Sequence, residues 1–144
     1  MLVKPPDLPS VAESILEQLT PGDVLALSGP LASGKTTLTQ HILQKMGYTG
    51  RVTSPTFVLE KHYPVGYKEF KEVVHLDFYR LKPEELTTFG WQEYLGDQTT
   101  LTIIEWPEIG LEHLPKSIKT IKLEIIDDQT RNFLFSKNLE PDKI

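Results

Sequence analysis

The residues best suited to chemistry in this sequence form one short run between positions 29 and 36. Its letters, GPLASGKT, satisfy GxxxxGK[ST], the pattern of a loop that binds phosphate groups. Backbone N–H groups in such a loop point inward at phosphate oxygens, and Gly34 lets the chain approach them closely. Lys35 reaches the β- and γ-phosphates, while the Thr36 hydroxyl coordinates Mg²⁺. The pattern therefore predicts a site for a nucleoside triphosphate and Mg²⁺.

The segments on either side of this run have the properties that a phosphate-binding loop requires. Val24–Ser28 (VLALS) is an apolar run that predicts a strand buried on both faces of a parallel sheet. From Thr36 to Met46 apolar residues recur at helical spacing, and Gly47 is suited to end that helix. A helix placed there directs its N-terminal dipole at the bound anion. This context favours a real phosphate loop over a chance match.

Two carboxylates end apolar runs elsewhere in the chain. Asp77 follows the run 73–76, and Glu105 follows the run 101–104. In an open α/β sheet the carboxyl ends of the strands line the ligand crevice, so both acids are expected near the γ-phosphate and Mg²⁺. A strand-end acid taken alone is more often a loop cap or a surface charge, but its combination with the loop favours a site. Which acid contacts Mg²⁺ directly is left open.

Thr56 and Trp106 are two further candidate nucleotide contacts. Thr56 lies in the segment TSPT at 53–56, just after the loop helix, where a hydroxyl or amide could sense the γ-phosphate. Alternatively, this segment is simply a turn before a strand. Trp106 follows Glu105 and could shield that acid or report on the nucleotide state, although a rigid strand exit is the plainer interpretation.

The remaining patterns predict one α/β domain over residues 1–144. Ser10 and Glu13 form a capping-box pattern that predicts the start of a first helix. Strands are expected at 57–63 and 72–78 around a polar connection (64–71), at 101–105, and as a pair at 121–125 and 131–136. The expected fold is that of P-loop NTPases, a mainly parallel sheet flanked by helices, with a C-terminal antiparallel strand pair. Residues 137–144 are expected to be a frayed tail.

Composition limits the function further. The net charge is −5 and the only arginines are Arg51, Arg80 and Arg131, so the chain is not expected to grip nucleic acid without a partner. The absence of cysteine excludes disulfides and thiol nucleophiles and fits a cytoplasmic protein. No membrane span or signal peptide is expected. The histidines lack metal-ligand spacing, and His75 is expected to be a packing residue with its hydrogen bonds satisfied, beside Asp77.

Five segments occur in an order that is specific when they are taken together. They are GPLASGKTT (29–37), VTSPTF (52–57), HLDFYRL (75–81), PEEL (83–86) and IEWPE (104–108). In this combination the chain resembles the bacterial TsaE family, once called YjeE. The resemblance implies a cytoplasmic P-loop ATPase needed for threonylcarbamoyladenosine in tRNA. It also implies docking onto the TsaB–TsaD complex, which ATP hydrolysis resets between turnovers, with tRNA reached only through these partners.

The resemblance also implies roles for individual residues. Thr36 and Glu105 would contact Mg²⁺, Asp77 would lie near it, and Trp106 would lie beside the γ-phosphate. Lys35, Asp77 and Glu105 are therefore the expected catalytic residues, and a monomer is the expected state of the chain alone. The expected contacts of ATP or ADP are Gly29, Leu31, Ala32, Ser33, Gly34, Lys35, Thr36, Thr37, Thr56 and Trp106.

Pro30 and Ala32 depart from the loop typical of this family, which reads G-[D/N]-L-G-A-G-K-T. Pro30 removes one N–H donor, and Ala32 is expected to resist a positive φ. Phosphate binding should survive both changes, and the properties expected to change are nucleotide affinity and loop mobility.

Three alternatives to an ATPase are consistent with the loop. A small-molecule kinase would share it, but the arginines needed for a lid over the phosphates are few and scattered. A nucleotide-gated binding module would bind ATP with little hydrolysis. A chance motif in an unrelated domain would show no response to ATP.

Overall fold

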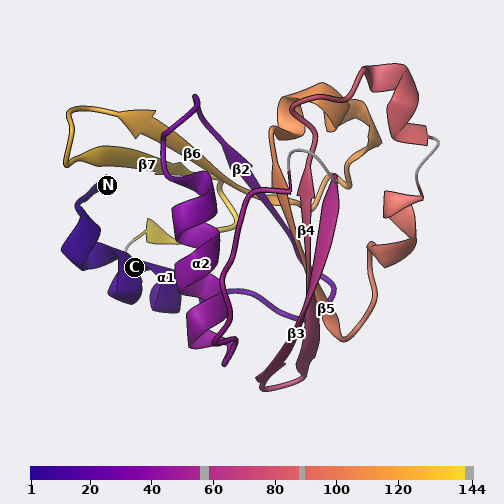
Figure 1. The fold of residues 1–144 in the computed structure, drawn as a ribbon, viewed down its shortest axis with the longest axis horizontal. Helices are drawn as coiled ribbons and strands as arrows, with labels where there is room; N and C mark the ends of the chain where they lie inside the picture. Colours follow the sequence, from indigo (N-terminus) through magenta and orange to yellow (C-terminus); the bar gives the residue numbers. More distant parts are fainter. Residues whose placement is uncertain (56–58, 88–89, 142–144) are drawn as a thin grey trace.

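The computed structural model describes residues 1–55, 59–87 and 90–141, and one sheet runs through it. The strands are β1 (Leu2–Val3), β2 (Val24–Ser28), β3 (Glu60–Tyr67), β4 (Phe70–Asp77), β5 (Thr100–Glu105), β6 (Lys119–Ile125) and β7 (Arg131–Phe135). The helices are α1 (Leu8–Leu16) and α2 (Lys35–Lys45), with 3₁₀ segments η1 (Pro5–Asp7), η2 (Pro83–Thr87), η3 (Trp91–Tyr94) and η4 (Pro107–His113). Figure 1 shows this arrangement.

The strand order is β1-β7-β6-β2-β5-β4-β3, with a parallel centre and antiparallel edges. β4, β5, β2 and β6 run parallel to their neighbours in this centre. β7 pairs antiparallel with β6 and with β1, and β3 pairs antiparallel with β4. The predicted antiparallel pair late in the chain is present, but the pairings of β3 with β4 and of β1 with β7 are antiparallel too, so the sheet is mixed rather than mainly parallel as expected.

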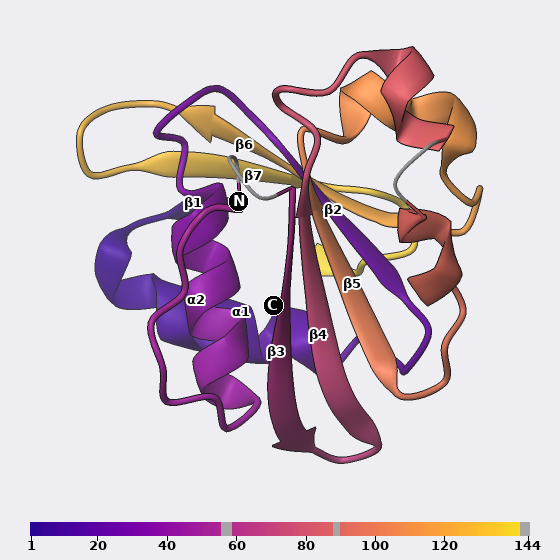
Figure 2. The same ribbon diagram turned by 45° about the vertical axis from the view of Figure 1, so that its right-hand side comes forward.

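The two faces of the sheet are covered differently. α1 and α2 pack together on one face, as Figure 2 shows, over a core that includes Leu25, Leu27 and Ile103. The other face is covered by η2, η3 and η4 around Phe78 and Trp91, whose rings meet edge to face at 5.3 Å. The expectation of a sheet flanked by helices is therefore met by α-helices on one face only. No helix among the described residues is long and apolar enough to cross a membrane.

The first helix begins earlier than its capping-box pattern predicts. α1 starts at Leu8, with a proline within its first two positions, where the missing N–H has no helical partner to lose. The Ser10 hydroxyl donates to the carbonyl of Asp7, and the Glu13 carboxylate pairs with Lys45 of α2 at 3.1 Å. These two side chains therefore serve other contacts, and the capping prediction is wrong.

The connection expected at 64–71 is strand for most of its length. β3 continues to Tyr67 and β4 starts at Phe70, with a register shift between Pro64 and Tyr67. Proline is tolerated here because β3 is the edge strand, where its missing N–H costs no ladder bond. β1, only two residues long, has no sequence periodicity by which it could be predicted.

The end of the described chain is packed rather than frayed. Leu139 is 1% exposed and belongs to the core beneath α1 and α2, while the Glu140 N–H donates to Gln18 at 2.7 Å. The expected frayed tail is wrong at these positions, and residues 142–144 of that expectation lie outside the described residues.

Replacing Leu139 with alanine tests this packing. We expect the free energy of unfolding to fall by about 2–4 kcal/mol, because a buried leucine leaves a cavity when truncated. Urea denaturation followed by circular dichroism measures the change. Leu134→Ala is the matched control, since Leu134 is 44% exposed. A loss below about 0.5 kcal/mol at Leu139, the range of ordinary surface substitutions, would mean that the tail is frayed after all.

Candidate nucleotide site

Strand register brings the two candidate acids together beside the phosphate loop. Asp77 at the end of β4 pairs in register with Glu105 at the end of β5, and Glu105 also lies opposite Leu27 of β2. The loop begins two residues after Leu27. Both carboxylates are buried, with Asp77 2% and Glu105 3% exposed. The parallel sheet therefore places both acids at the edge where the loop begins.

The backbone of the loop is held in left-handed conformations at three points. Gly29 has φ +147°, and a Cβ there would lie 2.5 Å from the Leu123 carbonyl oxygen, so only glycine fits. Gly34, the residue before α2, has φ +102°. Ala32 adopts φ 63°, a conformation that the sequence analysis expected alanine to resist. It costs an L-residue roughly 1–2 kcal/mol, which other contacts must offset.

Arg131 supplies contacts that hold the strained loop. From the start of β7, its Nε donates to the Ser33 carbonyl and its Nη2 to the Ala32 carbonyl, both at 3.2 Å. Nη1 of the same guanidinium donates to the carbonyls of Asp127 and Thr130. The carbonyls at the strained point are thereby fixed to the β6–β7 hairpin. Sequence reasoning did not single out Arg131, because the contact spans almost a hundred residues.

Lys35 lies folded back onto the loop. Its Nζ donates to the carbonyls of Gly29 at 2.7 Å and Pro30 at 2.8 Å, and it lies 4.5 Å from the ring centre of Trp106. Burial lowers the pKa of Lys35, and the nearby carboxylates of Glu105 and Asp77 oppose this without cancelling it. The cation is thus held by carbonyl oxygens of the loop itself.

Oxygen ligands converge between the loop and the strand ends. The Thr36 hydroxyl lies 3.1 Å from Glu105 Oε2, and Ser54 Oγ donates to Asp77 at 3.0 Å. Within the described residues, no three histidine, cysteine or acidic side chains are grouped so that they could hold a metal ion by themselves. One or two carboxylates, a hydroxyl and substrate phosphates are the usual ligands of Mg²⁺, and these residues fit that description.

His75 has a role that the sequence analysis did not assign. Its Nε2 donates to Glu105 Oε2 at 2.6 Å, and its side chain is fully buried. His75 precedes Asp77 by two residues on β4, so both side chains project from the same face of the strand. The imidazole and the Thr36 hydroxyl therefore both hold the Glu105 carboxylate through its Oε2 atom. The expectation of a buried, hydrogen-bonded packing residue beside Asp77 is met, but the partner that His75 bonds is Glu105, which was not foreseen.

A family model described as "Threonylcarbamoyl adenosine biosynthesis protein TsaE" matches residues 3–133, a span that includes the loop, both acids, His75 and Arg131. The chain belongs to the TsaE family.

Individual TsaE relatives cover most of this chain. It is 37% identical over 119 residues to "tRNA threonylcarbamoyladenosine biosynthesis protein TsaE" of Haemophilus influenzae, covering 81% of this chain and 73% of that protein. A protein of the same description from Bacillus subtilis is 33% identical, covering 93% of this chain and 82% of its own length. The crystal structure of Bacillus subtilis YdiB superposes with a TM-score of 0.75 at 29% identity, covering 94% of this chain and 83% of that one.

Trp106 closes one side of the site in this TsaE-family chain. It has φ 58°, a left-handed conformation that is uncommon for a bulky residue, and its ring packs against Tyr79 at 4.8 Å. Both rings line a cavity of about 450 Å³ that also contains Lys35 and Arg80. One of the three scattered arginines therefore lies at this cavity.

The expected nucleotide contacts are only partly grouped around this cavity. Thr56 lies outside the described residues, but its neighbour Ser54 lines the cavity. Gly29 and Ser33 do not line this cavity, and the Ser33 side chain is fully buried. The remaining expected residues that line the cavity are Leu31, Ala32, Gly34, Lys35, Thr36, Thr37, Asp77, Glu105 and Trp106.

A pair of substitutions at His75 tests its hold on Glu105. If Glu105 is a ligand of Mg²⁺, we expect His75→Leu to weaken Mg²⁺ binding in the presence of ADP about 10–100-fold, the usual effect of losing a hydrogen bond to such a ligand. His75→Gln can still present an N–H to Glu105 and should lie close to the parent chain. Calorimetric titration with Mg²⁺ measures both. Equal weakening by the two substitutions, or no weakening by either, would contradict the positioning role.

Proposed function

We propose that this chain is a P-loop ATPase of tRNA threonylcarbamoyladenosine formation that binds and hydrolyses Mg·ATP in the cytoplasm. The observation that supports this most directly is the convergence of Lys35, Thr36 and Glu105 at the edge of the sheet where the loop begins. Membership of the TsaE family supports the pathway.

The proposed binding step follows from the contacts of the loop. Phosphate oxygens enter among the N–H groups of residues 31–36 and the N-terminus of α2, where the helix dipole favours an anion. Lys35 exchanges the carbonyls of Gly29 and Pro30 for the β- and γ-phosphates. Mg²⁺, held by Thr36 with Glu105 or Asp77, would neutralise charge that develops on the phosphates. Trp106 and Tyr79 exclude water from one side.

In the proposed hydrolytic step, the acid that does not hold Mg²⁺ positions the water that attacks the γ-phosphate. Asp77 accepts hydrogen bonds from Ser54 Oγ and from the Tyr79 N–H, so its carboxylate has a fixed direction at the cavity wall. Glu105 is fixed between His75 and Thr36. Positioning of this kind is the main contribution that a protein makes to phosphoryl transfer.

Slow turnover by the chain alone is part of the proposal. Lys35 is already satisfied by loop carbonyls, and Glu105 by two side chains, so nucleotide must compete with existing contacts. Leu31 is 63% and Tyr79 41% exposed at the mouth of the cavity, a place where a partner could bury apolar surface. We propose the TsaB–TsaD complex as that partner, with tRNA held by the complex and the chain monomeric by itself.

A nucleotide-gated binding module is the second candidate. It is favoured by the existing contacts of Lys35 and Glu105, which a nucleotide would have to displace. The strained Ala32 and the missing N–H of Pro30 would lower the affinity for nucleotide further. In that case ATP binding alone would govern docking, and hydrolysis would contribute nothing to function.

Hydrolysis assays on the whole chain separate these candidates. We expect release of phosphate from Mg·ATP to be slow for the chain alone and to rise when the TsaB–TsaD complex is added. Glu105→Gln should lower turnover at least about 100-fold, because it removes a charge that acts in the transition state. ATP binding, measured by calorimetry, should survive in that variant and be lost in Lys35→Ala.

A matched control variant is available at Glu112. Glu112→Gln removes an exposed acid outside the site and should leave turnover unchanged. Tight ATP binding with no turnover under either condition would favour the binding module. No ATP binding at all would reject both candidates.

A further inference from the structure

The segment between α2 and β3 runs back along α2 toward the phosphate loop. Figures 1 and 2 show it leaving the far end of α2, passing beside the helix and reaching the edge of the sheet where β4 ends. Residues 48–55 belong to no helix or strand, so their backbone N–H and C=O groups need partners other than those of regular structure. The side chains that contact this segment therefore decide where it lies.

Gln40 of α2 holds the main chain of this segment. Its Oε1 accepts from the Val52 N–H at 2.9 Å, and its Nε2 donates to the Gly50 carbonyl at a longer 3.5 Å. Gln40 follows Thr36 by four residues, so the two side chains lie one above the other on the same face of α2. The helix face that presents Thr36 to Glu105 therefore also holds the segment.

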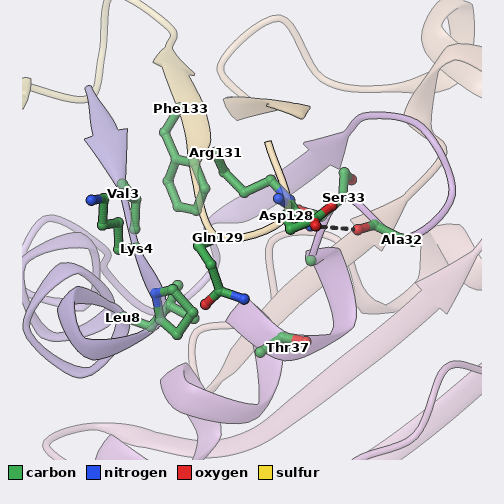
Figure 3. Close-up of a pocket in the computed structure, with 12 residues that line it drawn as sticks. Val3, Lys4, Leu8, Ala32, Ser33, Thr37, Asp128, Gln129, Arg131 and Phe133 are labelled. Atoms are coloured by element: carbon green, nitrogen blue, oxygen red, sulfur yellow. Dashed lines mark hydrogen bonds between the residues drawn. The ribbon is translucent and has the colours of Figure 1, made fainter. Parts of the chain in front are cut away.

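The start of α2 is itself held in place by the β6–β7 hairpin. Figure 3 shows Arg131 beside a second cavity, of about 210 Å³, that lies between the first residues of the chain, the hairpin and the first turn of α2. The guanidinium donates to the carbonyls of Ala32 and Ser33, which come just before that turn. Gln40 therefore ties the segment to a helix whose position beside the phosphate loop is fixed.

Ser54 lies two residues beyond Val52 and contacts one of the two acids. Its Oγ donates to Asp77 Oδ2 at 3.0 Å, and the Tyr79 N–H donates to Oδ1 of the same carboxylate at 2.8 Å. Consecutive Cα atoms are about 3.8 Å apart, so a shift of the Val52 main chain passes to Ser54 through only two peptide units. A displacement of about 1 Å would take the Ser54 hydroxyl beyond hydrogen-bond reach of Asp77.

A second contact ties the segment to the sheet. Lys61 of β3 donates to the Thr53 hydroxyl, and β3 pairs with β4, the strand that ends at Asp77. Lys61 therefore holds the segment to the sheet, whereas Gln40 holds it to the helix. Ser54 lies where these two supports meet.

We propose that Gln40 is a positioning residue for ATP hydrolysis, which acts by keeping Ser54 hydrogen-bonded to Asp77. The inference rests on the proposed ATPase activity and adds to it a link between the helix after the phosphate loop and the acid on β4. Glu105 is joined to the same helix face by Thr36. Through Thr36 and Gln40, one face of α2 thus sets the directions of both carboxylates at the site.

Two substitutions that keep the length of the Gln40 side chain test this role on the whole chain. Gln40→Met removes the acceptor for the Val52 N–H, whereas Gln40→Glu retains it, and all three residue types favour helices similarly. In Gln40→Met we expect kcat for phosphate release from Mg·ATP to fall about 10–100-fold, since a misplacement of about 1 Å can cost that much. KM for ATP and the affinity for Mg·ADP should stay within about threefold of the parent chain, because the phosphate loop is unchanged.

The remaining variants separate positioning from a merely structural role. Gln40→Glu should keep kcat close to that of the parent chain, and Gln44→Met, at an exposed glutamine one turn further along α2, is the matched control that should change neither kcat nor KM. In the Ser54→Ala background, Gln40→Met should lower kcat little further, because both changes act on the same hydrogen bond. In carbon NMR spectra of the nucleotide-free chain, the Asp77 carboxyl signal should move in Gln40→Met as it does in Ser54→Ala.

Three results would overturn the positioning role while leaving the proposed function in place. They are a parental kcat in Gln40→Met, equal losses in Gln40→Met and Gln40→Glu, and a joint loss of kcat and nucleotide affinity. A parent chain that binds Mg·ATP without hydrolysing it would instead reject the proposed hydrolysis. The Asp77 carboxyl signal then decides the contact by itself: a signal that moves in Gln40→Met would support the link from Gln40 to Asp77, and an unchanged signal would overturn it.

Discussion

The register of the parallel strands is the constraint on which the candidate site depends. Backbone hydrogen bonds fix Glu105 opposite both Asp77 and Leu27, so two acids and the start of the loop meet at one edge. Because side chains alternate between faces, a slip of one residue on β4 would turn Asp77 and His75 to the other side of the sheet. The position of both acids beside the loop is therefore determined by main-chain pairing and not by side-chain contacts.

The parts of the site that could be predicted from the sequence are those encoded locally. The phosphate loop has a fixed spacing, and its strand and helix have simple periodicities, so β2 and α2 lie within one residue of their expected bounds. Asp77 and Glu105 could be placed because each ends an apolar run and parallel strands share an edge. Gly47 has φ 90° and ends α2, as its type indicated.

The parts that could not be predicted depend on contacts between distant segments. Arg131 reaches carbonyls nearly a hundred residues earlier, and nothing in its local sequence distinguishes it from a surface arginine. The burial of Leu139 follows from the return of the chain to the end of α1, where the Glu140 N–H bonds Gln18, and not from any sequence period. The connection expected to begin at Pro64 continues β3 instead, because the place of Pro64 on an edge strand emerges only from the complete strand order.

The pairing of β1 with β7 joins segments from widely separated parts of the chain, and the cavity beside the loop has both of them in its walls. Bringing together strands that are so far apart in the sequence has a high entropic cost, and sheets dominated by such non-local pairs fold slowly. A ribosome-bound chain that has reached only β5 already carries the loop and both acids, yet lacks the hairpin that completes this surface. The surface on this side of the phosphate loop is thus completed late in folding, and a ligand bound there would stabilise the finished sheet over its partly assembled precursors.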